Sequence, residues 1–75
     1  MKITLLITID NDTSVSQDII SEWSVKKDGM QFFTKLQQYM NTYIMEYNKK
    51  NTIHIKCLEC FDEDGVLLMR MDKNE

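Results

Sequence analysis

Residues 28–50, DGMQFFTKLQQYMNTYIMEYNKK, form the longest segment of the chain with the periodicity of an α-helix. Asp28 is a suitable N-cap and Gln31 completes a capping box with it, so we expect the helix to begin at Asp28. Two lysines suit the negative end of the helix dipole, which predicts that the helix ends at Lys49 or Lys50. In a chain of 75 residues this helix must contribute to the only hydrophobic core.

Apolar and aromatic side chains recur along one face of this helix. The set comprises Phe33, Leu36, Met40, Tyr43, Ile44 and Tyr47, and it is widened by Phe32 and Tyr39. Such a face is typical of a helix that packs on a sheet, and we interpret it as core. The alternative, that part of this face forms a groove for a binding partner, stays open.

The residues before the helix predict one clear strand and one ambiguous element. In residues 2–9 apolar side chains at 3, 5, 7 and 9 alternate with mostly polar ones, which predicts a strand with one face in the core. Residues 14–26 fit a strand, because Ile19, Trp23 and Val25 alternate with polar residues. They also fit a short helix behind a capping box of Ser14 and Gln17. We favour the strand because serines and β-branched residues are frequent there.

The last third of the chain predicts a β-hairpin. Its DEDG segment, residues 62–65, suits a type I turn with Gly65 in the left-handed conformation, which pairs Asp62 with Val66.

Continuing this register along the strands pairs Lys56 with Asp72. It places one apolar set on the core face, namely Ile53, Ile55, Cys57, Phe61, Leu67, Met69 and Met71. A register shifted by one residue would pair Glu59 with Arg70 and divide the apolar set between both faces, so we favour the first.

Together these elements predict a single small α+β domain over residues 1–75. One long helix packs on a three- or four-stranded antiparallel sheet, in the order β-β-α-β-β, with a short helix as the alternative for the second element.

Composition narrows the location and the class of partner. A net charge of −3 and a pI near 5.0 argue against a nucleic-acid binder. No apolar run is long enough for a membrane helix, and residues 1–10 do not resemble a signal peptide, so we expect a cytoplasmic protein. The chain has no alanine or proline and eight lysines to one arginine, which indicates a low-GC genome and suggests a bacterial, phage or mobile-element gene.

His54, Cys57 and Cys60 have the spacing H-x2-C-x2-C, which resembles half of a zinc site. On a strand, Cys57 points away from the face that His54 and Cys60 share, and the sequence has no further cysteine or histidine to complete four ligands. The thiols also lack a helix N-terminus, which would lower the pKa of the first one. We therefore expect no metal and no cofactor, and keep a metal- or redox-dependent regulator using these three residues as the alternative function.

The acidic segments 10–18 and 62–64 are expected to lie near lysine pairs, at 49 and 50 and at 26 and 27 respectively. Each acidic loop then has a basic neighbour, which favours a solvated surface over a mimic of nucleic acid.

The favoured register leaves an apolar patch on the outer sheet face, formed by Leu58, Cys60 and Leu68 beside Leu6. We also expect the first strand to lie at a sheet edge and to support a homodimer.

The sequence contains no catalytic motif, so we expect no enzyme. The predicted function is a small protein-binding module, such as an inhibitor or accessory factor that masks the surface of a partner protein, with the patch of Leu6, Leu58, Cys60 and Leu68 as its partner or dimer contact.

Overall fold

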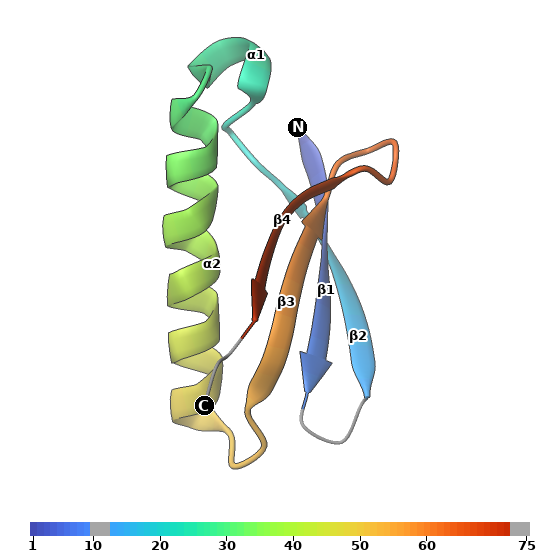
Figure 1. Cartoon of the computed structure of the whole chain (residues 1–75), viewed down its shortest axis with the longest axis vertical. Helices are drawn as coiled ribbons and strands as arrows, with labels where there is room; N and C mark the ends of the chain where they lie inside the picture. The colour runs from blue at the N-terminus through green and yellow to red at the C-terminus, as the bar shows by residue number, and fades with distance from the viewer. Residues whose placement is uncertain (10–12, 73–75) are drawn as a thin grey trace.

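The computed structural model of the protein describes residues 1–9 and 13–72 (Figure 1). Within them the elements follow in the order β1 (Lys2–Ile9), β2 (Ser14–Ile20), α1 (Val25–Asp28), α2 (Gln31–Lys50), β3 (Ile55–Phe61) and β4 (Leu67–Asp72). The predicted α+β fold, one long helix on an antiparallel sheet, is confirmed, and the sheet has four strands.

The strands lie in the order β2-β1-β3-β4, and each neighbouring pair is antiparallel. The alternation predicted for the first strand is confirmed, because Ile3, Leu5 and Ile7 are buried. The expectation that this strand lies at an edge is wrong, since β1 pairs with β2 on one side and β3 on the other. The open edges of the sheet are those of β2 and β4.

The ambiguous segment after β1 is a strand over its first half. Strand β2 pairs with β1 in an unbroken register from Lys2 opposite Ile20 to Thr8 opposite Ser14. The preference for a strand over a helix is therefore confirmed for residues 14–20, and the chain then leaves the sheet for the short helix α1.

The long helix begins three residues later than predicted, because Asp28 belongs to α1. The Ser24 side chain caps α1 by accepting a hydrogen bond from the Lys27 N–H (3.1 Å), and the Asp28 carboxylate accepts one from the Ser24 N–H (3.0 Å). Gly29 follows with φ 60°, a conformation that separates the two helices. The predicted end of the helix is confirmed at Lys50. No helix in the described ranges is both long enough and apolar enough to cross a membrane.

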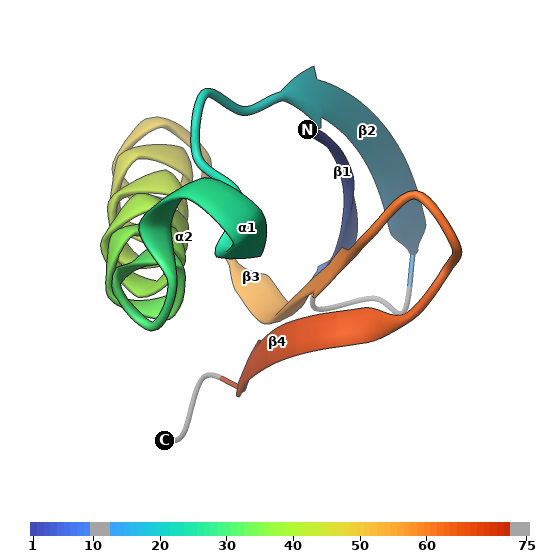
Figure 2. The same ribbon diagram turned by 90° about the horizontal axis from the view of Figure 1, so that it is seen from above.

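The sheet curls around α2, so that the core lies between the helix and the concave face of the sheet (Figure 2). Phe32, Leu36 and Met40 are the buried residues of α2. Phe33 is only partly buried, so the centre of the helical stripe is Phe32 rather than Phe33. The backbone of α2 approaches β3 and β4 but neither β1 nor β2 within the described chain, so side chains alone fill the space between α2 and β2.

The hairpin of β3 and β4 confirms the predicted turn. The Asp62 N–H donates to the Val66 carbonyl (3.0 Å), and Gly65 has φ 79°. Phe61 lies opposite Leu67, as the turn predicts.

Beyond this pair the predicted register is wrong, because Leu68 forms a β-bulge. Cys60 then lies opposite Met69, Glu59 opposite Arg70, and Cys57 rather than Lys56 opposite Asp72. A second irregularity lies in β3, where Lys56 is the extra residue between Ile55 and Cys57 in the pairing with β1. It puts Leu58 and Cys60 on the core face, opposite Ile7 and Leu5, and both are fully buried.

Candidate functional site

The predicted outer patch of Leu6, Leu58, Cys60 and Leu68 does not form, because the irregularity at Lys56 puts Leu58 and Cys60 on the core face of β3. Leu58 and Cys60 have no exposed surface, and Leu68 packs partly buried against the core. Only Leu6 is left on the convex sheet face, between Ser16 of β2 and Glu59 of β3. The assignment of these four side chains to one exposed contact surface is therefore wrong.

The convex face carries two sets of polar groups that interact with one another, beside the apolar side chains of Ile20, Phe61 and Leu67. Arg70 lies 3.8 Å from the Glu59 carboxylate and 3.1 Å from the Asp72 carboxylate. At the other side of the sheet, Asp18 accepts a hydrogen bond from the Thr4 hydroxyl (2.8 Å) and lies 3.5 Å from the Lys2 ammonium group. These contacts lower the pKa of Asp18, with the Thr4 bond as the first cause.

The predicted ligand cluster is divided by the sheet. Cys60 points into the core and Cys57 lies on the opposite face, across from Asp72, while His54 precedes β3 and is partly buried. Burial raises the pKa of the Cys60 thiol to about 11, and burial followed by the hydrogen bond with Asp72 raises that of Cys57. Both thiols therefore stay protonated near neutral pH, the opposite of what metal ligation or nucleophilic attack needs. No group of three or more His, Cys, Asp or Glu side chains within residues 1–9 and 13–72 could hold a metal ion.

The acidic hairpin turn has the basic neighbour that the sequence predicts. Lys26 of α1 lines a hollow of about 380 Å³ together with Asp62, Glu63 and Asp64. At the other end of the molecule, β3 and β1 lie between the C-terminal end of α2 and the start of β2 (Figure 1). Residues 10–12 of the acidic segment 10–18 lie outside the described residues.

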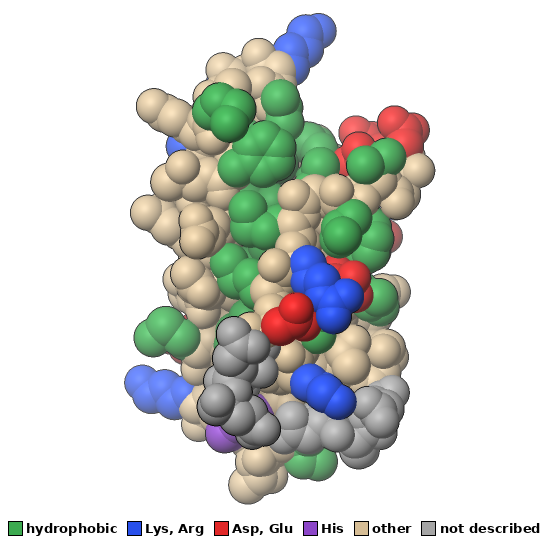
Figure 3. All heavy atoms as spheres, viewed as in Figure 1, with side chains coloured by type: hydrophobic (Ala, Val, Ile, Leu, Met, Phe, Trp, Pro, Cys, Tyr) green, Lys and Arg blue, Asp and Glu red, His purple; other side chains and the backbone are tan. Residues whose placement is uncertain are grey.

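One side of the helix shows apolar side chains that belong to the core. Figure 3 shows them as a band between α2 and β4. The β4 side chains of Leu68, Met69 and Met71 are partly buried there and pack against the core cluster. We interpret this band as the margin of the core, because its residues are continuous with the buried set.

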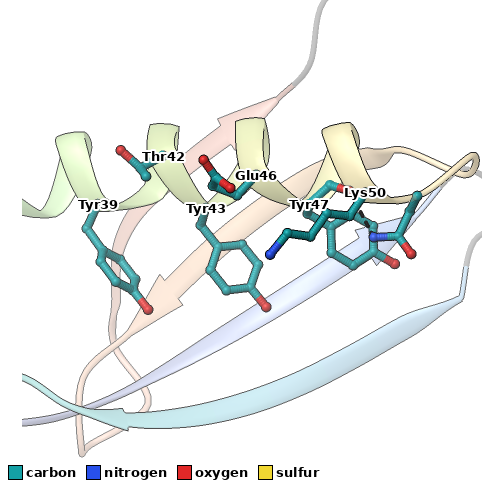
Figure 4. Close-up of a pocket in the computed structure, with 7 residues that line it drawn as sticks. Tyr39, Thr42, Tyr43, Glu46, Tyr47 and Lys50 are labelled. Carbon is teal, nitrogen blue, oxygen red and sulfur yellow. Dashed lines mark hydrogen bonds between the residues drawn. The ribbon is translucent and has the colours of Figure 1, made fainter.

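The other side of the helix carries a row of tyrosines that the structure places beside β2. Tyr39, Tyr43 and Tyr47 follow one another at one helical turn along α2, and their rings extend from the helix on the side facing the sheet (Figure 4). The Tyr43 hydroxyl donates a hydrogen bond to the Gln17 side chain of β2 (2.9 Å). Burial, then the neighbouring Tyr39 and Tyr47, raises the pKa of Tyr43, so its hydroxyl keeps the proton that it donates.

Two shallow hollows follow this row and meet at Tyr39. The first, of about 370 Å³, extends along the tyrosines to Lys50 and Asn51. The second, of about 400 Å³, lies among Ile19 and Ile20 at the end of β2, Trp23 and Tyr39. The rings of Trp23 and Tyr39 pack edge to face, 5.7 Å apart, and form the aromatic wall between the hollows.

The hydrogen bonds of the β1–β2 ladder show which backbone groups of β2 point outward. Met1 and Ser21 exchange two bonds (2.7 and 2.9 Å), and the Ile9 N–H donates to the Thr13 carbonyl (3.0 Å). In an antiparallel ladder such pairs alternate, so the odd-numbered residues of β2 face β1. The N–H and C=O groups of the even-numbered residues, Ser14, Ser16, Asp18 and Ile20, therefore point away from the sheet.

No strand pairs with this side of β2 in the part of the chain that the structure describes. All β2 side chains except that of Ile19 are exposed, including Val15 at 53% and Ile20 at 79%. We call this combination of the outward backbone groups of residues 14–20 and their exposed side chains the β2 edge. It is the candidate site, with the aromatic hollows beside it.

Part of this site is visible in the sequence. The tyrosines at positions 39, 43 and 47 have visible helical spacing, and the interpretation of the helical face left a partner groove open as an alternative. The role of Trp23 and the open edge of β2 were missed, because both depend on the order of strands in the sheet.

Comparison with protein-family models, with curated proteins and with solved structures found no match to this chain.

Proposed function

We propose that this chain is a non-enzymatic protein-binding module that takes up an extended segment of a partner protein as an additional strand at the β2 edge. The supporting observation is the row of outward backbone groups from Ser14 to Ile20 on a strand that is not paired on that side among the described residues. An added strand would satisfy these groups, since main-chain hydrogen bonds supply much of the affinity in this mode of recognition.

The aromatic hollows supply a basis for specificity. Alternate side chains of an added strand would lie on the concave side of the sheet, beside Val15 and Ile19. Ile19 lines the hollow with Trp23 and Tyr39, so an apolar side chain of the partner would gain contact with aromatic rings there. A partner segment with apolar residues at every second position fits this arrangement best.

Binding of this kind would act by masking. The partner segment would become part of a sheet and would be unable to pair elsewhere, as expected of an inhibitor or accessory factor. A phage or mobile-element origin is compatible with this role and rests on composition alone.

The alternative, a metal- or redox-dependent regulator, is less well supported. Cys57 and Cys60 lie on opposite faces of β3, and burial raises the pKa of both thiols.

Selection from a display library of random peptides tests the proposal. We expect enrichment of peptides with alternating apolar residues and binding that shifts the backbone amide signals of residues 14–20 in NMR spectra. Ser16→Pro removes one outward N–H without touching the bonds to β1, so it should abolish peptide binding, whereas the matched Ser16→Ala keeps that N–H and should bind as the wild type does.

Three results would overturn the proposal. They are the absence of any enriched peptide, equal affinity of the Ser16→Pro and Ser16→Ala variants, and amide shifts that map to β4 or the outer helix face. Thermal unfolding of both variants checks that the fold is kept.

A further inference from the structure

The β2 edge is complementary to a second copy of itself. We infer that two copies of this chain pair through antiparallel β2 strands around a two-fold axis that passes at Gln17. This inference rests on the same open edge as the proposed function and names a second copy as its occupant.

The outward backbone groups restrict the possible registers. Because residues 14, 16, 18 and 20 carry them, these residues must face one another across the new ladder, which leaves registers centred on Ser16, Gln17 or Asp18. Centring on Asp18 places two carboxylates directly opposite each other, which is unfavourable. Centring on Ser16 leaves Ile20 without an opposite residue in β2.

The register centred on Gln17 uses the whole strand. Ser14 lies opposite Ile20 of the second copy, and Ser16 lies opposite Asp18 of the second copy, so all four outward residues of each strand are paired. Asp18 then meets a hydroxyl donor twice across the axis and no like charge.

Apolar side chains on the concave face match in the same register. Val15, which is 53% exposed, lies opposite Ile19 of the second copy. Since Ile19 lines the hollow with Trp23 and Tyr39, Val15 of the second copy would cover the mouth of that hollow. Each copy does this for the other, so the aromatic wall is covered twice in one dimer.

The edge also lacks the features that keep edge strands apart. Strand β2 has no lysine and no proline, and its pairing with β1 has no bulge. Its single charge, on Asp18, already contacts Thr4 and Lys2 on the convex face. The β4 edge differs, because it has a bulge at Leu68 and an arginine at position 70.

The dimer would compete with the partner segment of the proposed function. Both occupants need the outward groups of the same residues, so a partner could bind only after the two copies separate. The homodimer would then be a resting form whose stability sets the apparent affinity for the partner.

Cysteine crosslinking tests the register directly. In the inferred pairing Gln17 meets itself as a pair without mutual hydrogen bonds, with Cα atoms about 4.5 Å apart, within the range of roughly 4.4–6.8 Å for a disulfide. Under mild oxidation Gln17→Cys should form a covalent dimer, whereas Ser16→Cys and the wild type should not. The native thiols of Cys57 and Cys60 are both buried.

Charge variants at one exposed position give an independent test by sedimentation. Ser16→Asp places like charges opposite Asp18 of the second copy twice and should weaken the dimer roughly tenfold. Ser16→Lys places opposite charges there and should strengthen it. A wild type that stays monomeric at hundreds of micromolar, a crosslink in Ser16→Cys in place of Gln17→Cys, or equal effects of Asp and Lys would overturn the inference.

The failure of the dimer and the failure of the proposed function can be told apart. A monomeric chain that still binds selected peptides at β2 removes only the second copy. Crosslinking at Gln17 without any selected peptide removes the partner segment and leaves the dimer.

Discussion

Replacing Phe32 by alanine should destabilise the protein far more than the same change at Phe33. Phe32 has no exposed surface and belongs to the buried cluster, whereas Phe33 only packs against it and is partly exposed. Truncation of a fully buried phenylalanine costs about 3–5 kcal/mol, because apolar contacts are lost and a cavity is left in the core. For the half-buried ring we expect about 1–2 kcal/mol.

Phe33→Ala is a closely matched control. The two rings pack edge to face, 5.2 Å apart at 83°, so both variants lose this contact, which is worth about 0.5–1.5 kcal/mol. Both changes also have the same effect on helix propensity. The difference between the variants therefore measures how much more deeply Phe32 is buried than Phe33.

Chemical and thermal denaturation give the readout. A domain of 75 residues is expected to have a free energy of unfolding of about 4–11 kcal/mol, so Phe32→Ala removes a large share of it. At about 4–8 °C per kcal/mol, its melting temperature should fall by roughly 12–40 °C. Equal losses in both variants, or a larger one for Phe33→Ala, would show that α2 is rotated about its axis and that the described core is wrong.

Three further changes test local features of the structure. The hydrogen bond from the Ser24 N–H, followed by that from Lys35, lowers the pKa of Asp28, so its stabilisation is present above the unfolded pKa of about 3.9 and is lost as pH falls through the folded pKa. Urea unfolding between about pH 6 and pH 3 should show a steeper loss of stability for the wild type than for Asp28→Asn, and parallel curves would contradict this. Thiol reagents at pH 8 should label Cys60 more slowly than a denatured control, because burial raises the pKa of that thiol to about 11, and rapid labelling of the folded protein would refute its burial. Gly29→Ala should lower the free energy of unfolding by about 1–3 kcal/mol through backbone strain, because Gly29 has φ 60° and ψ −137° and the added methyl group would meet no atom within 4 Å. Denaturant titration measures this loss, and an unchanged midpoint would argue against this conformation.

Local patterns predicted the elements that depend on neighbouring residues. The alternation from Ile3 to Ile7, the end of the helix at Lys50 and the turn at Gly65 all follow from side-chain period, dipole and backbone preference. The start of the helix was harder, because both Ser24 and Asp28 are good caps. Only the structure shows Asp28 bonded back to Ser24.

The features that the sequence did not predict depend on contacts between distant segments. A period-two pattern does not reveal the extra residue of a bulge. The extra residue Lys56 therefore reversed the predicted faces of Leu58 and Cys60, and the bulge at Leu68 changed their partners in β4. The open edge of β2 likewise depends on a distant contact. Strand β3 pairs with β1 and not with β2, the strand before it in the sequence, so the outer side of β2 is left open. The tyrosine row was visible in the sequence, but the side of the helix left uncovered depends on where α2 lies over the sheet.

The central position of β1 has a consequence for the order in which the protein can form. Its pairing with β2 needs only the first 20 residues, but its other side waits for β3, where Thr4 lies opposite Phe61. During synthesis the β1–β2 hairpin and α2 would therefore exist before the strand that completes the sheet. A chain interrupted after α2 would expose backbone groups along both sides of this hairpin, so it should be far more prone to aggregate than the finished protein.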